Sequence, residues 1–83
     1  MMHNIGICGA GLIGASWAVG FANHGYNVLV YDANPEIVSN FFKVVDQLVD
    51  DLEIFQKVDL KKLKSNIKIC NNIEEVCKES VLI

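Results

Sequence analysis

The sequence predicts an α/β fold in which helices cover both faces of a parallel sheet. First, the apolar runs at His3–Cys8 and Tyr26–Tyr31 are continuous rather than alternating, as in strands buried on both faces. Second, a glycine-rich turn and a helix-compatible segment separate these two runs. Third, strand-like and helix-like segments keep alternating to the end of the 83 residues. Right-handed crossovers then predict a doubly wound sheet with the spatial order 3-2-1-4.

Local signals place the remaining elements. Gly25 supplies the left-handed residue that ends the first helix. Asn34 and Pro35 form a strong helix start, and apolar residues then recur every three or four positions as far as Phe55. After the first strand, the expected elements are helix 12–24, strand 26–31, helix 35–56, a helical turn at 60–64, strand 67–70, helix 73–78 and strand 80–83.

The glycine-rich turn Gly9–Gly14 reads GAGLIG and joins the first strand to the first helix. In a turn of this kind Gly9 allows a tight bend and Gly11 leaves room for a pyrophosphate. Gly14 lets the helix pack closely on the strand. The unpaired N–H groups and the positive dipole end of the helix then point at the phosphates.

Asp32 directly follows the second expected strand, at the position where the acid of such a site is found. Its carboxylate can accept hydrogen bonds from the ribose hydroxyls and would repel a 2′-phosphate, so it predicts NAD rather than NADP. The candidate cofactor-binding residues are Gly9, Gly11, Leu12, Ile13, Gly14 and Asp32.

Charge and hydropathy argue against a nucleic-acid partner, a membrane span and a signal peptide. A net charge of −3 and a pI near 5.1 argue against a nucleic-acid footprint, which needs a basic patch. Five lysines between Lys57 and Lys68 are interpreted as a solvated face. The apolar run Ile5–Ala22 has no Lys or Arg before it, and glycines interrupt it, so we expect neither a membrane span nor a signal peptide.

The three cysteines, Cys8, Cys70 and Cys77, are odd in number and lack C-x-x-C spacing. A disulfide scaffold or a zinc site is therefore not expected, and reduced thiols in the cytoplasm fit better. We interpret Cys8 as a small buried residue that ends the first strand.

The fourth expected strand begins at Ser80, and the sequence stops at Ile83. A strand that ends so soon would leave a hydrophobic sheet edge uncovered. We therefore expect residues 1–83 to be the N-terminal part of a Rossmann domain, cut within its fourth strand.

The stretch Gly9–Pro35 resembles the N-terminal end of the 3-hydroxyacyl-CoA dehydrogenase family. The specific points are Gly-Leu-Ile-Gly followed by Ser16-Trp17-Ala18, the pair Phe21-Ala22, and Tyr31-Asp32. The likeness is greatest to the branch that includes lambda-crystallin (L-gulonate 3-dehydrogenase) and carnitine dehydrogenase. The order of the later segments also matches the family.

The resemblance implies an NAD-dependent oxidation of a secondary alcohol on a 3-hydroxyacyl-CoA or a short 3-hydroxy acid. By position, Leu12 and Ile13 carry over as pyrophosphate-contacting backbone and Asp32 as the ribose acid. The family's catalytic His–Glu pair, its substrate-side Ser and Asn, and the helical domain through which it forms homo-oligomers all lie beyond residue 83. No catalytic residue is assigned, since His3 and His24 do not match the catalytic position, and this chain alone is expected to be inactive.

Two alternatives remain open from the residues. One is a stand-alone module that binds NAD or a partner without turnover. The other is an FAD-binding Rossmann unit, although the second strand of such units usually ends in Glu rather than in an aspartate such as Asp32.

Overall fold

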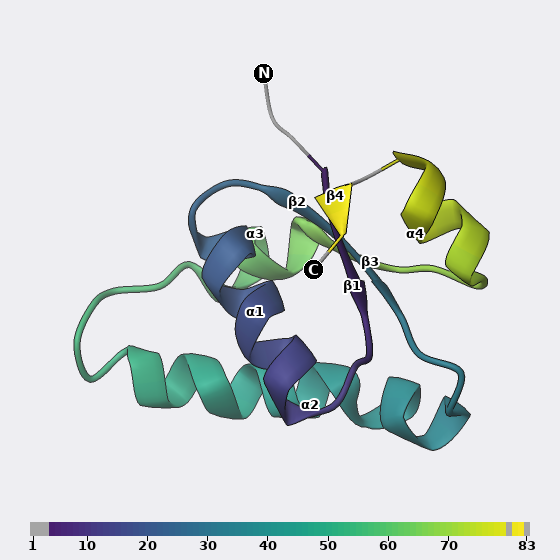
Figure 1. The fold of residues 1–83 in the computed structure, drawn as a ribbon. Coiled ribbons are helices and arrows are strands. Elements are labelled where there is room, and N and C mark those ends of the chain that lie inside the picture. The colour runs from purple at the N-terminus through teal and green to yellow at the C-terminus, as the bar shows by residue number, and fades with distance from the viewer. Residues whose placement is uncertain (1–3, 80, 83) are drawn as a thin grey trace.

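The computed structural model describes residues 4–79 and 81–82, and it contains one four-stranded parallel sheet with the order β3-β2-β1-β4 (Figure 1). The elements are β1 (Asn4–Cys8), α1 (Leu12–Asn23), β2 (Asn27–Tyr31), α2 (Pro35–Leu52), α3 (Leu60–Ser65), β3 (Ile67–Ile69), α4 (Ile73–Glu79) and β4 (Val81–Leu82). The predicted α/β class and the predicted strand order are confirmed.

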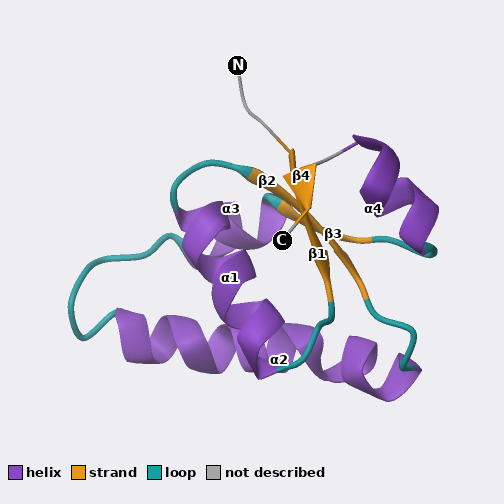
Figure 2. Ribbon diagram, viewed as in Figure 1, coloured by secondary structure: helices purple, strands orange, loops and turns teal. Residues whose placement is uncertain are grey.

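Helices lie on both faces of this sheet. The helices α1, α2 and α3 are on one face and α4 is on the other, as Figure 2 shows. The chain moves from β1 to β2 and β3 in one direction and then returns past β1 to β4, so β1 is central. Right-handed crossovers produce this layering, because reversing the direction of travel moves the connecting helix to the opposite face.

The side chains of β2 explain why its sequence is apolar throughout. Val28 and Val30 are fully buried in the larger cluster, which α1 and α2 cover. Leu29 points to the other face, where it packs with Val76 of α4 and with Cys70. Because both faces of the strand are covered, the alternation of polar and apolar residues is absent.

The helix α2 ends earlier than its apolar spacing predicts. Its last residue is Leu52, whereas the spacing predicts helix to about Gln56. Phe55 is 85% exposed, so the prediction that it continues the buried stripe is wrong. The stripe itself is real, since Phe41, Val45 and Val49 are completely buried.

The other boundaries agree with the prediction to within one or two residues. The first helix ends with His24 as its C-cap, and Gly25 adopts the expected positive φ of 89°. The short helix α3 is capped by Asp59, whose side chain accepts a hydrogen bond from the Lys62 amide at 3.1 Å. His3, Ser80 and Ile83, which belong to the predicted first and fourth strands, lie outside the described residues.

Replacing Asn34 by Ala should test the start of α2. The Asn34 side chain accepts a hydrogen bond from the Glu36 amide at 3.0 Å. Losing such a cap is expected to lower the free energy of unfolding by about 1 kcal/mol in urea titrations. The control Gln47→Ala, at an exposed position of the same helix, should change it by less than about 0.5 kcal/mol. An equal effect of both changes would contradict the cap.

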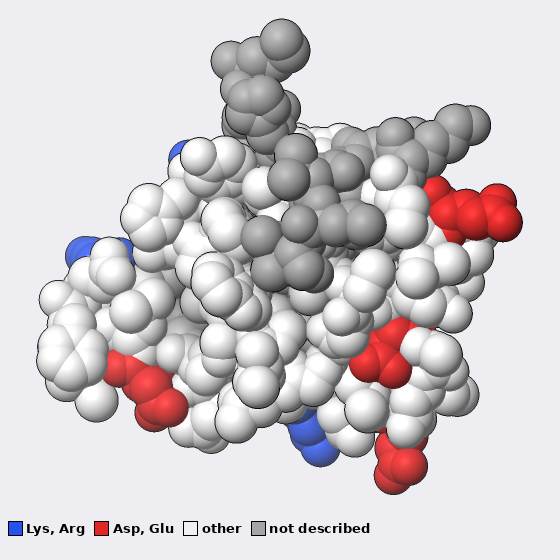
Figure 3. Space-filling model, in the orientation of Figure 1, with Lys and Arg blue, Asp and Glu red and all other residues white. Residues whose placement is uncertain are grey.

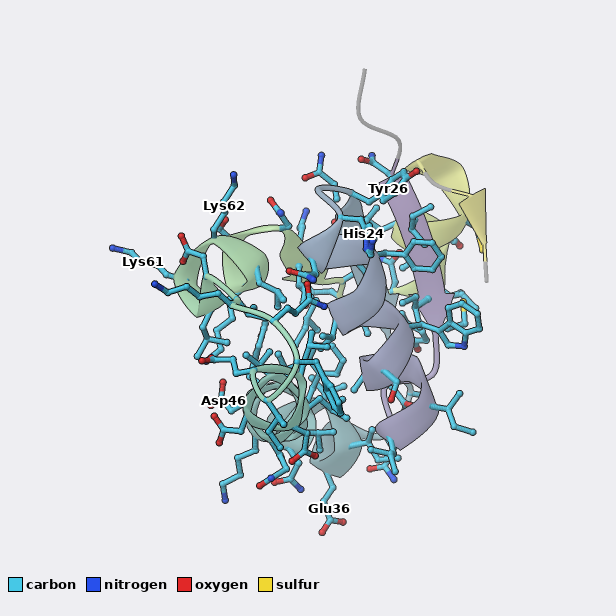
Figure 4. The ribbon with its side chains drawn as sticks, turned by 90° about the vertical axis from the view of Figure 1, so that its left-hand side faces the viewer. His24, Tyr26, Glu36, Asp46, Lys61 and Lys62 are labelled. Carbon is cyan, nitrogen blue, oxygen red and sulfur yellow. The ribbon has the colours of Figure 1, made fainter. Side chains whose placement is uncertain are left out.

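The lysine-rich segment is largely a solvated face, as predicted. Lys61 and Lys62 extend away from the body of the protein (Figure 4). Lys64 instead forms an ion pair with Asp46 of α2 at 2.6 Å, and Lys68 of β3 pairs with Glu75 of α4 at 2.7 Å.

Within the described residues, no helix combines the length and the apolar character that a membrane crossing needs.

Candidate functional site

The glycine-rich turn lies where β1 ends and α1 begins. Gly9 has a φ of 113°, a conformation that residues with a side chain rarely adopt. Its amide donates a hydrogen bond of 2.7 Å to the carbonyl oxygen of Tyr31, which ends the neighbouring strand β2. The chain can therefore leave the sheet sharply and enter the helix within three residues, as predicted for Gly9.

Gly14 is required by packing inside the protein. A Cβ atom built at Gly14 would lie 1.8 Å from the carbonyl oxygen of Gly9 and 2.9 Å from its carbonyl carbon. Both atoms belong to the backbone, so they cannot move aside as a flexible side chain would. The first turn of α1 thus packs directly on the chain that leaves β1.

Gly11 has no such reason in the protein itself. A Cβ atom built there meets nothing within 4 Å, and its φ of −73° is open to any residue. The space beside Gly11 is therefore free for a ligand to approach the backbone. A pyrophosphate needs that approach in a dinucleotide-binding turn.

The first turn of α1 leaves backbone donors available to an anion. Gly11 is the N-cap and has no side chain to accept hydrogen bonds from the next amides, and the first turn contains no acidic residue. The early amides of a helix have no partner within the helix, and they carry the positive end of its dipole. Leu12, Ile13 and Gly14 supply these amides.

A hollow of about 650 Å³ lies over this turn. It is lined by Ile7, Cys8, Gly9, Gly11, Leu12, Ile13, Gly14 and Trp17. None of these side chains is charged, and Figure 3 shows the charged atoms mainly at the margins of this face. A phosphate here would consequently be held by backbone N–H groups and the helix dipole rather than by Lys or Arg.

The carboxylate of Asp32 contacts the backbone on two sides. Oδ2 accepts a hydrogen bond from the Ala10 amide at 2.8 Å, and Oδ1 accepts one from the Asn34 amide at 2.8 Å. These two hydrogen bonds lower the pKa of Asp32 below its ordinary value of 3.8, and the bond from Ala10 has the larger effect. The carboxylate is therefore ionised at neutral pH, and both interactions weaken only when the pH falls through this lowered pKa.

A second hollow begins on the other side of Asp32, between the carboxyl ends of β2 and β3. It is lined by Tyr31, Asp32, Ala33, Pro35, Val38, Ser39, Ile69, Cys70 and Asn71. The sequence signals did not identify it, because its walls come from two loops that are distant in the chain. Together the two hollows follow the edge of the sheet where ligands of doubly wound folds bind.

Cys8 and His24, two residues considered in the sequence analysis, are not among the candidate cofactor-binding residues. Cys8 is exposed and lines the first hollow, so its interpretation as a buried residue is wrong. The side chain of a residue at the very end of a strand is no longer covered by the neighbouring layers.

His24 lies at the opposite end of α1 from the turn (Figure 4), where its Nδ1 is 2.8 Å from the Gly20 carbonyl oxygen.

A glycine turn with one open glycine, a helix start with free amides and an acid at the end of the next strand define a dinucleotide-binding domain of the Rossmann type. Residues 4–83 match the family described as 3-hydroxyacyl-CoA dehydrogenase, NAD binding domain. The chain belongs to this family, and the resemblance seen in its sequence is confirmed at that level. NAD is thereby supported over FAD as the cofactor of the family.

Individual relatives agree with this assignment. A probable 3-hydroxyacyl-CoA dehydrogenase of Caenorhabditis elegans is 32% identical over 89 residues, which cover 99% of this chain and 30% of that protein. The solved structure of (S)-3-hydroxybutyryl-CoA dehydrogenase from Ralstonia eutropha superposes with a TM-score of 0.83 at 22% identity, over 99% of this chain and 30% of that one. At that identity the superposition shows the fold alone.

A shorter match joins the chain to a different enzyme. Kynurenine 3-monooxygenase of Yarrowia lipolytica is 45% identical over 38 residues, or 46% of this chain and 8% of that protein. The chain thus spans about 30% of the length of the dehydrogenase that it matches throughout, and a much smaller part of the monooxygenase.

Proposed function

We propose that this chain is the NAD-binding portion of an NAD-dependent dehydrogenase that oxidises the secondary alcohol of a 3-hydroxyacyl-CoA or a short 3-hydroxy acid. The observation that carries the proposal is the open space at Gly11. Gly9 and Gly14 have structural reasons to be glycine, whereas Gly11 has none and lines the hollow at the start of α1, where a pyrophosphate would approach the backbone.

The residues of the two hollows have separate tasks in this proposal. The amides of Leu12, Ile13 and Gly14 bind the pyrophosphate, and Gly11 keeps its path open. Asp32 accepts hydrogen bonds from the adenosine ribose and repels a 2′-phosphate. NAD, when bound, supplies the hydride acceptor, so this chain contributes cofactor affinity and selectivity rather than proton transfer.

The narrower parts of the proposal concern the whole protein. Gly-Leu-Ile-Gly followed by Ser16-Trp17-Ala18 supports a place in the branch of lambda-crystallin and carnitine dehydrogenase. The three cysteines form no disulfide, which supports a location in a reducing compartment such as the cytoplasm. Residues beyond 83, including the catalytic His–Glu pair and the helices of a homo-oligomer, would complete the enzyme, and the small-molecule substrate would bind there.

Asp32→Ala is expected to weaken NAD binding about tenfold, because hydrogen bonds to a charged acceptor are lost. The preference for NAD over NADP should narrow by a similar factor, since the 2′-phosphate would no longer meet a carboxylate. Trp17 lines the first hollow and is the one tryptophan in the sequence, so its fluorescence can report both titrations. Unchanged selectivity would remove Asp32 from the ribose role.

A stand-alone module without turnover makes the same contacts with NAD and differs only in lacking a reaction. Purifying the protein with whatever sequence follows residue 83, and assaying NADH formation with 3-hydroxybutyryl-CoA, separates these two readings. NADH formation supports the dehydrogenase. NAD binding with no turnover of this or other short 3-hydroxyacyl substrates supports the module.

A further inference from the structure

The glycine turn is tied to the sheet by few bonds. Residues Gly9–Gly11 belong to no helix or strand, and the Gly9 amide makes one bond to β2. The next amide, that of Ala10, donates to the side chain of Asp32 rather than to the backbone. This bond joins residues that are 22 positions apart, so it fixes the turn against the following loop.

Asp32 also holds the start of α2. Its second oxygen accepts from the Asn34 amide, and Asn34 is the N-cap of that helix. One carboxylate therefore bridges the turn before α1 and the loop before α2. Bonds from N–H groups to an ionised acceptor are about twice as strong as those between neutral groups, which makes this bridge an effective support.

The bridge leaves room for a ligand. The two oxygens of an ionised carboxylate offer about four acceptor sites, and Ala10 and Asn34 occupy two of them. The side chain of Asp32 is half-buried, so the remaining sites are reachable from the second hollow, which Asp32 helps to line. Hydroxyl groups can therefore bind without breaking the bridge.

We propose that Asp32 is a positioning residue for the pyrophosphate-binding turn, acting through the Ala10 amide, in addition to any contact with ribose. This inference rests on the proposed function, because the turn matters only if it binds a phosphate-containing ligand. The carboxylate supports anion binding indirectly, by holding the amides that follow Ala10 in register. The negative charge of the carboxylate, acting directly, would instead repel the anion and weaken its binding.

These opposite effects make the proposal testable with a probe that has no ribose. Inorganic pyrophosphate is titrated into the wild-type protein and Asp32→Ala, with the amide resonances of Leu12 and Gly14 as the readout. A positioning role predicts binding at least threefold weaker in the variant. Equal or tighter binding, which the loss of a negative charge alone would produce, overturns the proposal.

Amide hydrogen exchange without any ligand tests the bridge separately. Exchange at Ala10 and Asn34 is expected to become about tenfold faster in Asp32→Ala, while Val19 within α1 keeps its rate. The control Asp50→Ala removes the same charge from an exposed position of α2, and should leave exchange and pyrophosphate binding unchanged. Unchanged exchange at Ala10 overturns the bridge even if NAD binds. If exchange at Ala10 is faster in Asp32→Ala but the wild-type protein does not bind NAD, the result counts against the proposed function and not against the bridge.

Discussion

Replacing Gly14 by Ala is expected to lower the free energy of unfolding by about 3 kcal/mol or more, the upper range for overpacking a tight contact. The added methyl group would lie 1.8 Å from the carbonyl oxygen of Gly9, so α1 must shift away from the chain leaving β1. Urea unfolding followed by circular dichroism measures the loss.

Gly20 provides the matched control in the same helix. A Cβ atom there meets nothing within 4 Å, so Gly20→Ala relieves the entropic cost of glycine without a clash. We expect it to raise the free energy of unfolding by about 0.5–1 kcal/mol. If Gly14→Ala were as stable as Gly20→Ala, the close packing at Gly14 would be refuted.

Gly11→Val should have its effect on binding rather than on stability. The valine side chain would fill the open space beside the turn, and we expect about 100-fold weaker NAD binding, equivalent to losing one or two charge-assisted hydrogen bonds. The free energy of unfolding should change by no more than about 1 kcal/mol, since the φ of −73° suits valine and its Cβ atom would meet nothing within 4 Å.

The smaller change Gly11→Ala should give an intermediate loss of affinity. Trp17 fluorescence or titration calorimetry measures both variants under the same conditions. Binding of NAD at full strength by Gly11→Val would show that the pyrophosphate does not pass this residue, and the proposed cradle would have to be abandoned.

Much of the fold could be predicted because the local and the long-range signals agree. The continuous apolar runs of β1 and β2 require cover on both faces, and crossover handedness then leaves one sensible strand order. The glycines at 9 and 25 were expected to bend the chain, and both have a positive φ. These are properties of the residue itself or of its nearest neighbours.

The errors arise where a side chain depends on its distant surroundings. Apolar spacing continues to Phe55, but the helix ends at Leu52, and the next apolar side chains, Ile54 and Phe55, are exposed. Cys8 reads as a strand residue and yet is exposed at the strand end. The bond between Ala10 and Asp32 leaves no trace in either local sequence, because it depends on how the two loops meet.

The bonds around the glycine turn also bear on the thermodynamics of association. Gly9 is fixed to Tyr31, Ala10 to Asp32, and the Ala15 amide closes the first helical turn on Gly11 at 2.9 Å. These bonds restrict the conformational freedom of the turn before a ligand arrives. A ligand that meets such a preorganised surface gives up less of its binding free energy to ordering the protein.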